Sequence, residues 1–182
     1  MEKAVMLSIR PKWCEKIASG EKTIEVRKTR PKLETPFKAY IYCSRGSDAR
    51  RLRGSWGKVI GEFTCTNLDW ITRVGFSGRL MPSRYSICSH NNMDVLPIDD
   101  LLHAARLSYA ELANYLDGGN GYGWHISDLR IYDTPKELSK FQRATDPCDS
   151  CPAEYSWECT GCEKLSGDIK RPPQSWCYVE EG

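Results

Sequence analysis

Three side chains that suit the binding of a phosphorylated or nucleotide-like ligand lie close together near the start of the chain. Lys22, Glu25 and Arg27 combine an ammonium, a carboxylate and a guanidinium. A guanidinium binds phosphate through two parallel hydrogen bonds, whereas a carboxylate accepts hydrogen bonds from the amino group of a base. Because side chains alternate in a strand, we expect Thr23, Glu25 and Arg27 on one face. The alternative is that Glu25 and Arg27 form an internal salt bridge that only braces the fold.

Basic and aromatic residues elsewhere extend this candidate site. Residues 1–60 hold fifteen Lys or Arg against six Asp or Glu, and such an excess favours a polyanionic partner, although a merely solvated basic face explains it equally well. Lys28 and Arg30 add positive potential, and aromatic rings would stack on bases, which suits single strands. The predicted ligand-binding residues are Arg10, Lys12, Lys22, Glu25, Arg27, Tyr40, Tyr42 and Trp124.

A few residues are candidates for catalysis if the ligand is a substrate. His125 is a candidate proton carrier, although a histidine in a strand is more often structural. Cleavage of RNA requires an activated 2′-hydroxyl and charge stabilisation, which Lys22 with His125 or Ser127 would provide. The sequence contains no Gly-rich phosphate loop followed by Lys-Ser/Thr and no His-Glu-x-x-His motif. The catalytic candidates are Lys22, Glu25, His125 and Ser127.

Five of the nine cysteines fall in the last 35 residues. Two Cys-x2-Cys pairs separated by seven residues predict a tetrahedral zinc site, with an iron–sulfur cluster or a redox-active or structureless tail as alternatives. Four thiolates leave no open position, so the zinc would be structural. The linker is shorter than in many zinc ribbons, and Cys177 is therefore either a substitute ligand or a free thiol. The predicted metal ligands are Cys148, Cys151, Cys159 and Cys162.

Short strands dominate the expected structure. In the strand expected at Thr23–Arg27, Ile24 and Val26 alternate with polar side chains and are expected to face the core. The tail at the C-terminus returns to an alternating pattern and is expected to dock on the main domain. Apolar and alternating runs predict the strands Val5–Ile9, Thr23–Arg27, Phe37–Cys43, Val59–Cys65, 121–132 and Ser175–Val179.

Helix signals are few but specific. A helix is expected to begin at Pro11 and to end at Gly20, because Pro suits the first helical position and Gly the end. Capping boxes predict short helices at Ser108–Glu111 and Thr134–Glu137. Residues 66–96 lack sustained periodicity and are interpreted as an irregular, exposed excursion that borders the site.

Residues 20–27, GEKTIEVR, match the GxKxxExR pattern of the ASCH domain, and residues 7–13, LSIRPKW, resemble the strand-to-helix entry of that family. The resemblance implies an α+β fold: a small PUA-like β-barrel flanked by short helices, with a cleft beside the motif. Some ASCH relatives hydrolyse an acylated cytosine derivative with a Lys and with a Thr at the motif position of Glu25. This chain lacks that Thr, so we do not expect that activity. Residues 1–143 would form the barrel domain and 144–182 a metal-binding appendage.

Three hypotheses for function follow. The first is a module that binds single-stranded RNA or a nucleotide-like ligand in a basic cleft around the motif; the second is a hydrolase acting on RNA or a modified nucleoside; the third is a metal-stabilised adaptor with a protein partner. The chain has no apolar run of about 18 residues, which argues against a membrane partner. Its start does not resemble a secretory signal, so a cytoplasmic location is expected, with a monomer as the default state.

Overall fold

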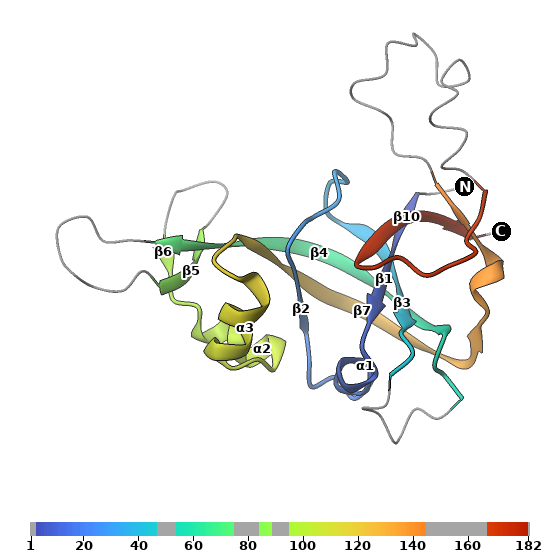
Figure 1. Cartoon of the computed structure of the whole chain (residues 1–182), viewed down its shortest axis with the longest axis horizontal. Coiled ribbons are helices and arrows are strands. Elements are labelled where there is room, and N and C mark those ends of the chain that lie inside the picture. The colour runs from blue at the N-terminus through green and yellow to red at the C-terminus, as the bar shows by residue number, and fades with distance from the viewer. Residues whose placement is uncertain (1–2, 47–53, 75–83, 89–94, 145–166, 182) are drawn as a thin grey trace, which may run out of the picture. The chain divides into compact units, whose positions relative to one another are not determined.

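The computed structural model describes residues 3–46, 54–74, 84–88, 95–144 and 167–181 (Figure 1). The chain divides into two compact units. Unit 1 consists of Met1–Glu15, Phe37–Phe63 and Leu129–Gly182, and unit 2 consists of Lys16–Pro36 and Thr64–Asp128. The expected boundary between residues 143 and 144 stays a prediction.

Unit 1 is built on a mixed sheet with the strand order β7–β4–β3–β1–β10–β8–β9. β1 pairs in parallel with β3 and antiparallel with β10, so it lies between them (Figure 1). The C-terminal strand thus pairs with the first strand of the chain, and docking of the whole 144–182 appendage stays a prediction. The elements are β1 (Ala4–Ile9), β3 (Phe37–Cys43), the first part of β4 (Lys58–Val74), the last part of β7 (Gly121–Lys136), the 3-10 helix η1 (Leu138–Lys140), β8 (Phe141–Arg143), β9 (Gly167–Asp168) and β10 (Trp176–Glu181).

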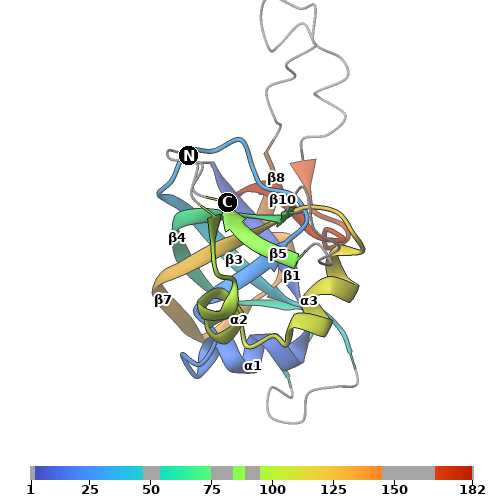
Figure 2. The ribbon, with the colours of Figure 1, turned by 90° about the vertical axis from the view of Figure 1, so that its left-hand side faces the viewer.

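Unit 2 contains the motif strand β2 and most of the helical residues. The strand order is β2–β7–β4–β5–β6, and α2 and α3 lie beside each other in both views (Figures 1 and 2). Ile24 and Val26 of β2 belong to an apolar core with residues of α2 and α3, as the alternation predicts. The elements are the last turn of α1 (Pro11–Ala18), β2 (Ile24–Arg27), the remainder of β4 and β7, β5 (Arg84–Cys88), β6 (Val95–Leu96), α2 (Asp99–Ala105) and α3 (Tyr109–Leu116).

Local sequence signals account for both ends of α1 and for the start of α3. α1 begins at Pro11, and Gly20 adopts a φ of +75°, a conformation that favours glycine. At α3 the predicted capping box forms in full: Ser108 Oγ accepts from the Glu111 amide at 3.2 Å, and Glu111 Oε2 accepts from the Ser108 amide at 2.9 Å. Both helices therefore begin where the sequence predicts.

Two expectations about local structure are wrong. Thr134 lies in β7, and the short η1 helix that follows Glu137 has no side-chain cap, so the second capping box does not start a helix. Residues 66–74 continue β4, and 70–74 pair with β5 (84–88), so these parts of the 66–96 segment are strands. At Thr134, strand pairing outweighs the helix-capping signal. Along 66–74, it forms a strand although the sequence shows no sustained alternation. Residues 75–83 and 89–94 of that segment lie outside the described residues.

The expected β-barrel is not confirmed. In neither unit does the strand order return to its first strand, as far as the described residues show. What the structure does show is a mixed fold of extended sheet and short helices. Over the same residues no helix is long and apolar enough to cross a membrane.

Candidate functional site

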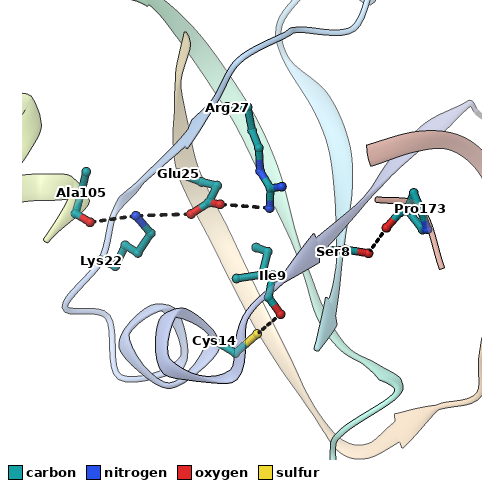
Figure 3. Close-up of polar contacts among 8 residues, drawn as sticks. All are labelled: Ser8, Ile9, Cys14, Lys22, Glu25, Arg27, Ala105 and Pro173. Carbon is teal, nitrogen blue, oxygen red and sulfur yellow. Dashed lines mark hydrogen bonds and ion pairs between the residues drawn. The ribbon is translucent and has the colours of Figure 1, made fainter. Parts of the chain in front are cut away.

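The three motif side chains contact one another in unit 2 (Figure 3). Arg27 Nη2 lies 3.0 Å from Glu25 Oε1, and Lys22 Nζ lies 3.3 Å from the other carboxylate oxygen, Glu25 Oε2. Both cations thus share one carboxylate. The formal charge of these three side chains together is +1. We refer to Lys22, Glu25 and Arg27 as the motif cluster.

Backbone hydrogen bonds hold the motif strand between α2 and β7. The Thr23 amide donates to the Ala104 carbonyl at 2.9 Å, and the Ile126 amide donates to the Thr23 carbonyl at 2.9 Å. Lys22 Nζ donates to the Ala105 carbonyl at 2.8 Å, at the C-terminus of α2. A cation there is favoured by the helix dipole and satisfies a carbonyl that the helix leaves unpaired. Lys22 therefore has a structural role as well as a place in the cluster.

The motif cluster is buried. Lys22 is 2% exposed, and Glu25 and Arg27 are each 6% exposed. Burial lowers the pKa of Lys22; the Glu25 carboxylate opposes this effect and the Arg27 guanidinium adds to it. The three groups lie together, but the predicted cleft is not confirmed at these side chains. The contacts also match the alternative in which Glu25 and Arg27 form an internal salt bridge that only braces the fold.

The other predicted ligand residues are distributed over both units. Trp124 is in unit 2, where it pairs in register with Glu25, but its side chain is fully buried. Tyr40 and Tyr42 are 3% and 4% exposed and belong to the apolar core of unit 1. Their burial favours a packing role, and ligand stacking by these rings stays a prediction. In the same unit, Arg10 and Lys12 are exposed.

Two rings that the sequence analysis did not single out border the motif cluster. Tyr122 of β7 pairs in register with Arg27. Tyr115, at the end of α3, is 40% exposed. Burial raises the pKa of Tyr115, and the charges of Arg27 and Glu25 act on it in opposite directions. Both rings therefore lie next to the motif cluster.

His125 belongs to a hydrogen-bonded chain with two residues of β4. His125 Nε2 lies 2.7 Å from Asp69 Oδ2, and Asn67 Nδ2 donates to Asp69 Oδ1 at 3.0 Å. Ser127 Oγ, further along β7, lies 3.1 Å from Thr66 Oγ1. His125 and Ser127 are among the residues predicted from the sequence, whereas Asp69 is not. The signal available was a polar Asn-x-Asp pair within the segment interpreted as irregular.

The predicted metal ligands Cys148, Cys151, Cys159 and Cys162 lie outside the described residues. Cys177 lies in β10, where its side chain is 9% exposed and burial raises the pKa of its thiol. Within the described part of the chain there is no group of three or more His, Cys, Asp or Glu side chains that could hold a metal ion. The zinc site stays a prediction.

Comparison with known proteins gives structural neighbours only. No family model matches the chain, and no curated protein does. The crystal structure of ASCH from Zymomonas mobilis is similar, with 18% identity and a TM-score of 0.49, and the match covers 74% of this chain and 73% of that one. A Tyr-to-Phe mutant of the Zymomonas mobilis protein is similar at 18% identity and a TM-score of 0.49, over 75% of this chain and 77% of that one. A Ser-to-Ala mutant gives the same identity and TM-score, over 74% of each chain.

Proposed function

We propose that this chain binds RNA or a nucleotide-like anion through the basic region that starts at the motif cluster. The observation that carries the proposal is that Lys22 and Arg27 share the single carboxylate of Glu25 at 3.3 and 3.0 Å. Charges interact more strongly in a buried, low-dielectric environment than in water. The formal charge of +1 is buried, so it would attract a phosphate at the neighbouring surface through its electric field and not by direct contact.

The exposed residues next to the motif support the same ligand class. Residues 27–32, RKTRPK, contain four basic residues and no acidic one, and Lys28 and Arg30 are exposed. The positive charge therefore continues from the buried cluster to the surface. An adaptor with a protein partner does not require this arrangement.

The proposal is tested by replacing Lys22 with Met. This change removes the surplus positive charge and leaves Glu25 and Arg27 as a neutral pair. Because Lys22 also donates to the Ala105 carbonyl, circular dichroism must first show that the variant folds. Affinity for a short single-stranded RNA, measured by fluorescence anisotropy, should fall about tenfold, because the variant loses the attraction between the buried positive charge and a phosphate at the nearby surface. Lys140→Met, which removes an exposed lysine from unit 1, is the matched control and should bind like the wild type. Equal affinity of both variants would contradict the proposal.

A second candidate function is hydrolysis of RNA or of a modified nucleoside. The contact that favours it is His125 Nε2 to Asp69 Oδ2, because a carboxylate that orients a histidine supports proton transfer. Mass spectrometry of a panel of RNAs and nucleosides incubated with the protein tests this candidate. Product should form with the wild type and with His103→Asn, which alters an exposed histidine of α2, but not with His125→Asn. Absence of product from the wild type rules out these substrates.

We also propose that the cysteine-rich segment forms a structural zinc site, with the ligands Cys148, Cys151, Cys159 and Cys162. The support is the spacing of the two Cys-x2-Cys pairs. The segment is poor in aliphatic residues, and the metal would supply the free energy that orders it. This site would stabilise the appendage and take no part in binding the ligand.

A further inference from the structure

Two exposed cations next to the motif strand each lie over an aromatic ring of unit 2. Lys28 Nζ lies 5.6 Å from the ring centroid of Tyr115, and Arg30 Cζ lies 5.8 Å from the ring centroid of Tyr122. Lys28 and Arg30 follow β2 directly, whereas Tyr115 ends α3 and Tyr122 lies in β7. We refer to these four residues as the cation–tyrosine surface. It brings two positive charges and two rings together from three elements of the same unit.

We infer that the cation–tyrosine surface is the docking site for single-stranded RNA, with phosphates on Lys28 and Arg30 and bases on Tyr115 and Tyr122. The inference rests on the proposed function and names the residues that carry it. Stacking of a base on an aromatic ring is stronger than a cation–π contact at an exposed site. A base can therefore replace the cation on each ring, and the released cation then binds the adjacent phosphate.

The exposure of Tyr115 distinguishes this surface from the buried aromatics near the motif, and Tyr122 is half-buried. Tyr115 is 40% exposed, in contrast to Trp124, which is fully buried. A hydrogen bond between the Tyr115 hydroxyl and the Lys28 backbone restrains the ring. A ring that is both exposed and held in place loses little conformational freedom when a base stacks on it. Unpaired bases are required for such stacking, so the surface suits a single strand rather than a duplex.

The charges are tested with the double variant Lys28→Gln, Arg30→Gln. The matched control is Lys170→Gln, Arg171→Gln, which removes two exposed cations of unit 1. The probe is an oligo-uridylate of about ten nucleotides, within the range that single-strand binding domains contact. The plot of log affinity against log salt should become less steep by about 1.4 in the first variant, because each lost phosphate contact in a single strand accounts for about 0.7. The control should keep the slope of the wild type.

The rings are tested with Tyr115→Ala and Tyr115→Phe. Loss of the ring should weaken binding of the oligo-uridylate by roughly 5- to 150-fold, the range that corresponds to one stacked base. Tyr115→Phe keeps the stacking surface and should bind within about twofold of the wild type. Retention of full affinity by Tyr115→Ala would overturn the inference, and so would equal affinity for the single strand and for its duplex.

The outcomes separate this inference from the function on which it rests. Failure of the wild type to bind any RNA would end both proposals. Binding that is weakened by Lys22→Met but unchanged by the Lys28→Gln, Arg30→Gln pair would leave the proposed function standing and end this inference alone. Weakened binding in both variants, with both controls unaffected, supports the two together.

Discussion

Arg27 Nη2 lies 3.0 Å from Glu25 Oε1, and both side chains are almost fully buried. Because Lys22 contacts the same carboxylate, Glu25 is the acid that balances the charge of the motif cluster. Replacement of Glu25 by Gln should destabilise the protein by about 3–5 kcal/mol, since it takes the carboxylate away from buried cations. Chemical denaturation followed by circular dichroism measures the change.

The matched control for Glu25→Gln is Glu21→Gln. Glu21 is exposed at the turn that precedes the motif strand, and its replacement should change the free energy of unfolding by less than about 0.5 kcal/mol. Similar stabilities of the two variants would show that the buried carboxylate contributes no more than a surface one.

A second prediction concerns acid sensitivity of unit 1. Burial favours the neutral form of Glu62, but hydrogen bonds from Tyr132 and Lys38 outweigh it and lower the pKa of this carboxyl below its usual 4.5. Burial likewise opposes the ionised form of Glu181, and Lys136 contributes to lowering its pKa. A carboxyl whose pKa is lowered by folding stabilises the protein above its unfolded pKa, and the contribution disappears as pH falls through the folded pKa.

The free energy of unfolding should therefore fall as the pH is lowered below about 4.5, by up to about 1 kcal/mol for each of these partly exposed groups. Urea denaturation at several pH values provides the measurement. The double variant Glu62→Gln, Glu181→Gln should lose part of this acid dependence. If the wild type and the double variant show the same pH profile, the ion pairs of Glu62 and Glu181 do not contribute to the acid dependence of the free energy of unfolding.

The metal content of the purified protein tests whether the cysteine-rich segment binds zinc. Protein purified without chelator should contain about one zinc per chain, the stoichiometry of a four-cysteine site. Cys148→Ser, Cys151→Ser should lose the metal, whereas Cys88→Ser, which alters a half-buried thiol of β5, should retain it. Elemental analysis distinguishes zinc from iron. Metal-free wild-type protein would remove the zinc site from the account.

The sequence predicts the backbone of the motif better than its environment. Gly20 permits the positive φ at the turn, and the alternation of Ile24 and Val26 correctly identifies the core face of β2. The burial of the polar face depends on groups remote in sequence: the carbonyl that Lys22 contacts lies 83 residues away, at Ala105. No local pattern encodes that contact. A basic motif therefore predicts exposed side chains, although in the folded protein these side chains are buried.

The two capping boxes show the same limit of local signals. Ser108 and Glu111 form the reciprocal hydrogen bonds, and α3 follows. Thr134 and Glu137 have equivalent spacing, yet Thr134 belongs to β7, a long strand beside β4. A capping box contributes only about 1 kcal/mol, and strand pairing along β7 outweighs it. Only the tertiary arrangement distinguishes the two cases.

The salt dependence of RNA binding tests the central claim most directly. The wild-type chain is titrated with a labelled oligo-uridylate at several salt concentrations, and the logarithm of the affinity is plotted against the logarithm of the salt concentration. We expect a straight line that falls by about 0.7 for each phosphate held by a basic side chain, with a slope of about −1.4 or steeper. A flat line, or no binding at low salt, would contradict the proposal that the basic region around Lys22 and Arg27 binds RNA.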